Sequence, residues 1–320
     1  MNTLTLRLAE PLAVRRIQAA AFAAMIAFFA IAPLFIYPVY LMKVMCFALF
    51  ACAFNLLIGF CGLLSFGHAM FFGVAGYATA HAAKVWGLTP ELAVLFGMAC
   101  AGALGLGTGL LAIRRQGIYF AMITLALAQM VYFFVLQAPF TGGENGLQAV
   151  PRGKLFGLVD LNQPAALYAF VFAIFIAGFF AVWRIVHSPF GQVLKAIREN
   201  EPRAISLGYE VDRHKLLAFV LSATLAGAAG AAKVLVFQLA ALPDAHWSMS
   251  GEVVLMTLLG GLGTLLGPVV GAAVIVMMHN YLAHLDAWVM AIQGVIFAVC
   301  VLAFRRGLIG ELAHRIVRPL

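Results

Sequence analysis

Apolar runs of about 20 residues recur along most of the chain and are separated by short polar stretches. A helix needs about 20 consecutive apolar residues to cross the hydrocarbon core of a bilayer. The runs are continuous rather than alternating, which excludes a transmembrane barrel. The pattern therefore predicts an all-α, polytopic helical membrane protein. The expected spans lie near 18–37, 40–60, 66–84, 91–113, 118–138, 164–186 and 215–240.

The segment 251–304 is less regular than the rest of the chain. Three short crossings are expected there, near 251–264, 266–283 and 287–304, which brings the total to about ten transmembrane helices. The run GGLGTLLGP at 260–268 is too rich in glycine for an ordinary span. We interpret it as a broken helix or a re-entrant segment, which is tolerated where it is buried in protein or lines a cavity.

The stretch from Ser188 to Gly208 is the longest polar segment between two spans. Its apolar residues recur at i, i+3, i+4 and i+7, which is the spacing of one face of an amphipathic helix. From these residues alone, such a helix either rests on lipid headgroups or receives a partner protein. The residues of this stripe are Phe190, Val193, Leu194 and Ile197.

A second, very short helix is predicted directly after the first. Asn200 or Glu201 can act as its N-cap, and Pro202 fits the first helical position, where no backbone N–H is missed. Gly208 stands where a left-handed helix stop is expected. Two capped, charged helices in one loop favour the docking of a partner protein over simple contact with lipid.

The composition excludes a soluble globular protein, because 64% of the residues are hydrophobic, 10% are charged and the mean hydropathy is +1.03. The net charge of +8 does not indicate a nucleic-acid partner, because the basic residues form four clusters rather than one patch. The positive-inside rule places these clusters and both termini in the cytoplasm, and the loop 139–163 outside. The clusters are Arg7, Arg15 and Arg16; Arg114 and Arg115; Arg184, Lys195, Arg198, Arg203, Arg213 and Lys215; and Arg305, Arg306, Arg315 and Arg318.

No catalytic constellation is found, so the chain is not expected to be an enzyme. The acidic residues lie in loops or at the edges of spans, with Glu91, Asp244, Glu252 and Asp286 closest to the membrane. This argues against a proton- or sodium-coupled carrier, which usually needs buried carboxylates. The chain has no G-x-x-x-x-G-K-[ST] loop, so another chain must supply any ATP hydrolysis. The five cysteines lack metal-ligand spacing, and no metal site is predicted.

Polar residues at membrane depth are the remaining candidates. They either bond to neighbouring helices or line a neutral translocation path; for His68, flanked by Gly67 and Ala69, a structural role is favoured. Lys233 is a lone charge in a run of Ala and Gly, and it either snorkels toward the outer face or faces the path. The other candidates are Asn55, Ser65, Tyr77, Thr79, Tyr119, Thr124 and Gln129.

Small residues repeat at the spacing of one helix face, which allows helix backbones to approach closely in lipid. We expect these positions to serve helix packing rather than to line a pore. They are Gly105 and Gly109, Ala223–Gly227–Ala231, and Gly263–Gly267–Gly271.

Five blocks of the sequence resemble, in order, the LivM-type permease subunit of branched-chain amino acid ABC transporters, and together they cover about residues 40–309. The first two are FNLLIGFCGLLSFGHAMFFGVAGYATA (54–80) and RRQGIYFAMITLALAQM (114–130). The others are TGGENGL (141–147), HSPFGQVLKAIRENEPRAISLGYEVDRHKLLAFVLSA (187–223) and SGEVVLMTLLGGLGTLLGPVVGA (250–272). Lys233 departs from the family's usual pattern, in which an uncharged residue stands at this position.

The resemblance implies a multi-pass permease of the bacterial inner membrane that pairs with a LivH-type second permease. Two cytosolic ATPase subunits, which bind ATP and magnesium, and a periplasmic amino-acid-binding protein would complete the importer; this chain would bind no cofactor. By the same resemblance, the coupling segment 187–214 matches the importers' Glu-Ala-Ala…Gly loop. The matching residues are Glu201, Arg203, Ala204 and Gly208, with Arg198 and Pro202 beside them.

Residues 1–320 are therefore interpreted as a single importer transmembrane domain for branched-chain or related amino acids. The alternatives are a permease for urea or short-chain amides, a stand-alone secondary carrier or channel, and a structural subunit of a membrane enzyme complex. Because the external binding protein would supply affinity, only a weak substrate site is expected in this chain. No charged pocket for an α-amino acid is apparent from the sequence.

Overall fold

The computed structural model describes residues 20–282, together with 292, 294, 295, 298, 299, 302 and 307–311. The crossing expected near 287–304 falls largely outside these residues. The basic clusters before the first expected span and after the last also lie outside them.

The chain divides into two compact units, Met1–Leu41 and Met42–Leu320. The described part of the first unit holds the apolar helix Ala20–Leu34, whose last turn is the 3-10 helix η1 (Ala32–Leu34), and the beginning of α2. All elements that are discussed below as a site belong to the second unit.

Five helices of the described part are long and apolar enough to cross a membrane. At 1.5 Å per residue the 17-residue α3 (His68–Lys84) also reaches about 26 Å. These boundaries agree with the expected spans to within a few residues, and they confirm a polytopic helical protein. The five are α2 (Pro38–Asn55) with its π-helical extension η2 (Leu56–Cys61), α4 (Pro90–Ala112), α5 (Ile118–Gln137), α6 (Pro164–Val186) and α9 (Val211–Phe237).

The glycine-rich run 260–268 joins two short helices that pack against each other, α10 (Trp247–Gly260) and α11 (Gly267–Leu282). We refer to α10, α11 and their turn as the hairpin. The helices are about 21 and 24 Å long, shorter than a hydrocarbon core of about 30 Å. Gly261 and Gly263 in the turn have positive φ angles of 123° and 73°. The helix is therefore broken here, and the total of about ten spans stays a prediction.

The centre of the second unit is formed by α3, α4 and α9, which pack closely on one another. A Cβ atom added to Gly227 of α9 would lie 2.5 Å from the Cβ of Ala101 in α4, and one added to Gly105 would lie 2.6 Å from the Cβ of Ala223. A larger side chain at either glycine would push the helices apart. The expectation that small residues serve helix packing is confirmed at these positions.

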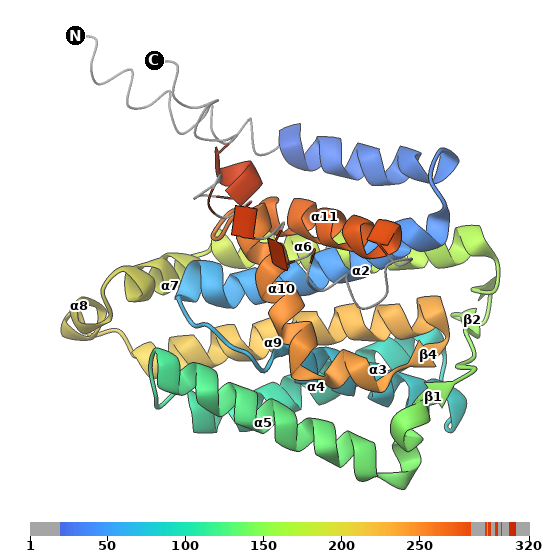
Figure 1. The fold of residues 1–320 in the computed structure, drawn as a ribbon, viewed down its shortest axis with the longest axis horizontal. Coiled ribbons are helices and arrows are strands. Elements are labelled where there is room, and N and C mark those ends of the chain that lie inside the picture. The colour runs from blue at the N-terminus through green and yellow to red at the C-terminus, as the bar shows by residue number, and fades with distance from the viewer. Residues whose placement is uncertain are drawn as a thin grey trace. The chain divides into compact units, whose positions relative to one another are not determined.

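Figure 1 shows α7 (Pro189–Glu199) and α8 (Glu201–Ser206) at one end of the helices and the short strands at the other. Strand β1 (Leu147–Gln148) pairs antiparallel with β4 (Leu239–Ala240), with Leu147 opposite Ala240. The loop 139–163 therefore lies at the end opposite α8, in agreement with the charge pattern. The remaining short elements are β2 (Lys154–Leu155) paired with β3 (Val159–Asp160), and the 3-10 turns η3 (Pro139–Thr141), η4 (Gly143–Asn145) and η5 (Leu242–Ala245).

Arg152 fastens the 139–163 loop to the end of α9. Its Nε and Nη2 atoms donate to the carbonyl oxygens of Leu235 and Val236, at 3.1 and 2.8 Å. A cation at this position also complements the negative end of the helix dipole. The last turn of α9 is therefore held in place by the loop.

Candidate functional site

The amphipathic helix α7 forms as its sequence predicts. Ser188 is its N-cap, because the hydroxyl oxygen accepts a hydrogen bond of 3.3 Å from the backbone N–H of Gly191. Leu194 and Ile197 of the apolar stripe are 0 and 3% exposed, so this face is buried in the protein. The alternative that α7 merely rests on lipid headgroups does not account for this burial.

The short helix α8 is capped by Asn200, whose Oδ1 accepts a hydrogen bond of 3.0 Å from the backbone N–H of Arg203. Asn200 rather than Glu201 is thus the cap, and Pro202 occupies the second helical position instead of the first. Gly208 ends the segment with a φ of +86°, as expected for a left-handed stop.

One face of α8 is anchored and the other is exposed. Ala204 is buried against Ile197 of α7 and Val211 of α9. On the outside, Ile205 and Leu207 are 57 and 67% exposed, and they lie beside Arg203, which is exposed too. We call the exposed side of α8 the docking face. Apolar side chains with an arginine among them are typical of the centre of a protein interface.

Glu201 points back into the protein rather than out from the docking face. Its Oε1 accepts hydrogen bonds from Nζ of Lys215 at 2.5 Å and from Nε2 of Gln116 at 2.8 Å. Lys215 belongs to α9 and is 2% exposed, whereas Gln116 lies in the turn between α4 and α5. The sequence analysis did not identify Lys215 and Gln116 as partners of Glu201. No sequence signal indicated this pair, because Lys215 directly follows the polar residues 212–214 and resembles one more charge of a polar helix start.

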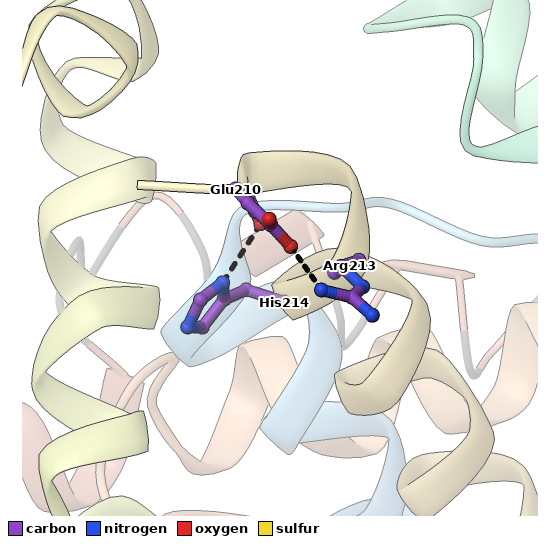
Figure 2. Close-up of polar contacts among 3 residues, drawn as sticks. All are labelled: Glu210, Arg213 and His214. Atoms are coloured by element: carbon purple, nitrogen blue, oxygen red, sulfur yellow. Dashed lines mark hydrogen bonds and ion pairs between the residues drawn. The ribbon is translucent and has the colours of Figure 1, made fainter. Parts of the chain in front are cut away.

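Figure 2 shows the first turn of α9, where Glu210 Oε2 and Arg213 Nη1 form an ion pair at 2.5 Å. His214 Nδ1 lies 2.8 Å from the backbone oxygen of Glu210 (Figure 2). The His214 ring stacks on Phe190 of α7, with 5.8 Å between the ring centroids. The ion pair is exposed, lies within one helical turn and contributes little stability. The stacked rings, in contrast, connect α7 to α9.

Arg198 and Asn55 connect α7 to the hairpin. Nη1 of Arg198 donates to the backbone oxygen of Gly59 in η2. Asn55, at the end of α2, donates from Nδ2 to the Thr264 oxygen at 2.8 Å and accepts from the Gly263 N–H at 3.0 Å. Both polar groups of the Asn55 side chain thus bond the turn of the hairpin. Single π turns such as η2 occur frequently at functional sites.

Ser65, His68 and Thr124 are fully buried near the beginning of α3. Ser65 Oγ accepts from the Gly67 N–H, and Thr124 Oγ1 accepts from the Phe66 N–H, both at 3.2 Å. His68 Nε2 lies 2.8 Å from Oγ of Ser222 in α9, which itself bonds the Ala53 oxygen. These side chains join helix ends and neighbouring helices.

Two further predicted path residues, Tyr77 and Gln129, make no side-chain hydrogen bond in the part of the chain that the structure describes. The Tyr77 hydroxyl is buried there without a hydrogen-bond partner, close to Gly146 of the loop 139–163. Gln129 is half-buried on α5. For all of the path candidates, a role in translocation stays a prediction.

Lys233 neither snorkels to the outer surface nor stands alone. Its Nζ forms an ion pair with Oδ1 of Asp244 in η5 and lies 5.7 Å from the ring centroids of Phe47 and Phe72. Asp244 is in a loop, as the sequence indicates, but the loop folds inward and leaves it 6% exposed. The expectation that the acidic residues stay away from buried positions is therefore wrong for Asp244.

A cavity of about 400 Å³ lies beside Lys233. It is lined by four ionisable side chains from four helices: Lys43 of α2, Lys233 of α9, Glu252 of α10 and His279 of α11. Glu252 Oε2 and His279 Nε2 are 3.7 Å apart across the hairpin. The expectation that the chain has no charged pocket is thus wrong, because these charges are dispersed in the sequence and meet only in the fold.

The rest of the cavity wall is apolar and follows helical spacing. On each of the four helices the ionisable residue is accompanied by an apolar residue three or four positions away, on the same helix face. These apolar residues are Phe47, Phe237 and Val276, and Met249 and Met256 flank Glu252 on α10. The cavity thus combines a few polar groups with an apolar wall, as small-molecule sites usually do.

Residues 36–302 match the family model described as "Branched-chain amino acid transport system / permease component". The chain belongs to this permease family. It resembles the high-affinity branched-chain amino acid transport system permease protein LivM of Escherichia coli (strain K12), with 25% identity over 80% of this chain and 65% of the relative. The match therefore spans just under two thirds of that relative's length.

Other proteins that resemble this chain are named for different substrates. The ribose import permease protein RbsC of Bacillus subtilis (strain 168) is 27% identical over 69% of this chain and 70% of its own length. The autoinducer 2 import system permease protein LsrC of Enterobacter sp. (strain 638) is 27% identical over 63% of this chain and 59% of its own length. No solved structure matches the chain.

Proposed function

We propose that this chain is the LivM-type permease subunit of an ATP-driven importer for branched-chain amino acids in the bacterial inner membrane. A LivH-type second permease, two cytosolic ATPase subunits that bind ATP and magnesium, and a periplasmic binding protein complete the transporter. The observation that carries the proposal is the docking face, which α7 and α8 present at the end of the helices where Arg114 and Arg115 also lie.

The contacts behind the docking face supply a route for the ATPase motion. Glu201 connects α8 to α9 through Lys215, and Arg198 connects α7 to the π turn through the Gly59 oxygen. Asn55 extends this second connection to the turn of the hairpin. Movement of α7 and α8 would then displace the hairpin relative to α2 and α9, and rigid-body movements of this kind underlie alternating access.

The substrate class is supported by the LivM relatives and by the charged cavity. A permease for urea or short-chain amides shares the architecture, and relatives named for ribose and autoinducer 2 widen the choice. A cargo without charged groups would leave the Lys43 ammonium without a counter-charge in the described part of the chain. This favours a zwitterionic amino acid.

The test is reconstitution of the chain with its neighbouring permease and ATPase subunits in proteoliposomes. We expect uptake of labelled leucine that requires both ATP and the external binding protein, with competition by isoleucine and valine. Stimulated ATPase activity with uptake of urea or ribose instead would retain the permease and replace the cargo. Leucine flux without ATP would contradict the importer and favour a stand-alone carrier or channel.

A further inference from the structure

Two ionisable groups that face the cavity, Lys43 and Glu252, are not held by a short ion pair in the described part of the chain. Lys233 is neutralised by Asp244. Lys43 has no carboxylate within ion-pair distance in the described part of the chain, and Glu252 makes only a long contact there, 3.7 Å to Nε2 of His279, which is an ion pair only when the imidazole is protonated. Ionisable groups inside a membrane protein are costly unless they are paired, and they usually mark a functional site. The Lys43 ammonium is therefore available to a ligand carboxylate, and Glu252 can exchange its long contact with His279 for a shorter ion pair with a ligand ammonium.

We propose that this cavity binds the zwitterion of an aliphatic α-amino acid. The carboxylate of the amino acid pairs with Lys43, its ammonium pairs with Glu252, and its side chain packs against Phe47, Met249 and Met256. The volume of about 400 Å³ lies in the range of about 300–1,000 Å³ that is typical of small-molecule sites. The inference rests on the proposed function and gives the permease its own substrate site.

The two ionisable groups lie on different elements, which the proposed transport cycle would displace relative to each other. Lys43 lies on α2, whereas Glu252 lies on α10 of the hairpin, whose turn Asn55 holds. A displacement of the hairpin would separate the two counter-charges of the bound amino acid. The same movement that opens the path would thus weaken binding, because both ends of a zwitterion are held only while the two groups keep their spacing.

The experiment uses the complete complex of both permeases and the ATPases in nanodiscs, without the binding protein. Binding of labelled leucine is measured for the wild type, Lys43→Gln and Glu252→Gln. The matched controls are Lys154→Gln and Glu144→Gln, which remove exposed charges in the loop 139–163. We expect each cavity variant to bind leucine at least tenfold more weakly, and each control to bind it as the wild type does.

A second measurement uses only the wild-type complex and therefore does not depend on how the variants fold. 4-Methylpentanoate lacks the ammonium group of leucine, and 3-methylbutylamine lacks the carboxylate. We expect each to compete with leucine at least tenfold less well than unlabelled leucine does. Equal competition by either analogue, or unchanged binding by both cavity variants, would overturn the zwitterion site.

Uptake in proteoliposomes separates this inference from the proposed function. Wild-type uptake that Lys43→Gln and Glu252→Gln leave unchanged would overturn the site and retain the importer. Leucine binding by the wild-type complex without any ATP-dependent uptake would retain the site and contradict the importer. We expect uptake by the wild type and its loss in both cavity variants, with the ATPase activity still stimulated by the binding protein.

Discussion

At the scale of single residues, the informative side chains are largely buried lysines of α9 that pair with a carboxylate from another element. Lys215 and Lys233 each find a carboxylate from another element, Glu201 and Asp244. The pair at the docking end is unequal, because the side chain of Lys215 is 2% exposed and that of Glu201 is 20% exposed. Breaking such a pair costs most when the more deeply buried charge is left behind.

This inequality predicts an asymmetric effect on stability. Glu201→Ala leaves the Lys215 ammonium buried without its carboxylate, and we expect a loss of about 3 kcal/mol in the free energy of unfolding. Lys215→Met removes the buried charge and leaves Glu201 with Gln116, so the loss should be about 1 kcal/mol. Denaturant unfolding of the purified chain checks this order. A larger loss in Lys215→Met would contradict it.

At the scale of elements, helices and their ends could be predicted from the sequence because the signals are local. Hydrophobic runs located the spans, the apolar stripe located α7, and Asn200 or Glu201 and Gly208 marked where α8 begins and ends. The cap of α7 by Ser188 was not predicted. The position of the N-cap of α8 could be predicted only to within one residue, as Asn200 or Glu201. Both candidate caps precede the same proline, and only the observed hydrogen bond to the Arg203 N–H distinguishes them.

The docking face makes a prediction of its own. Arg203→Glu reverses its charge, and Gly208→Pro is incompatible with a φ of +86° because proline fixes φ near −65°. We expect both variants to reach the membrane in normal amounts and to lose more than 90% of binding-protein-dependent uptake, a rough figure based on loss of the whole coupling contact. Immunoblotting of membranes measures the amount of each variant, and uptake of labelled leucine measures its transport activity.

Milder changes serve as controls for these two variants. Gly208→Ala keeps a left-handed backbone at a cost of about 1 kcal/mol, so it should retain much of the uptake. Arg184→Glu reverses an exposed charge on α6, outside α8. Full uptake in Arg203→Glu, or equal loss in Arg184→Glu, would remove the coupling role of this face.

Helix packing gives a third prediction. Gly227→Val would force its Cβ to within 2.5 Å of the Ala101 Cβ and separate α4 from α9. Overpacking of this kind costs about 1–3 kcal/mol, and thermal unfolding in detergent should show it. Gly107→Val is the matched control. Gly107 lies on α4, the helix that carries Ala101, and no atom lies within 4 Å of a Cβ added to it. Equal melting temperatures for the two variants would contradict the packing role.

At the scale of the whole molecule, the cavity is the feature that the sequence could not reveal. Lys43, Lys233, Glu252 and His279 lie on four helices, and each is a single ionisable residue when it is read in its own segment. Their meeting depends on the inward fold of the loop after α9 and on the break between α10 and α11. Neither of these features can be predicted from local sequence signals alone. The path candidates predicted from their polarity are largely side chains that hydrogen-bond neighbouring helices instead of lining the cavity.

The sidedness of the molecule is a prediction at the same scale. Leu158 in the loop 139–163 is 87% exposed, and Ser206 on the docking face is exposed at the opposite end. A membrane-impermeant maleimide should label Leu158→Cys in spheroplasts and should label Ser206→Cys only after permeabilisation. The wild type measures the background from its native cysteines, of which Cys46, Cys52 and Cys61 are buried. Labelling of Ser206→Cys in intact spheroplasts would reverse the topology.

The helix α9 is continuous from Val211 to Phe237 and carries Lys215 near one end and Lys233 near the other, about 27 Å apart along its axis. It acts as a strut of constant length between the docking end and the cavity, so its two ends cannot shift independently along the axis. Any movement of the docking face relative to the cavity must therefore be taken up by the interrupted elements beside α9, which are η2 and the hairpin turn. Gly62, Gly261 and Gly263, with their positive φ angles, interrupt the helices at those two places, and we expect any such movement to be concentrated there.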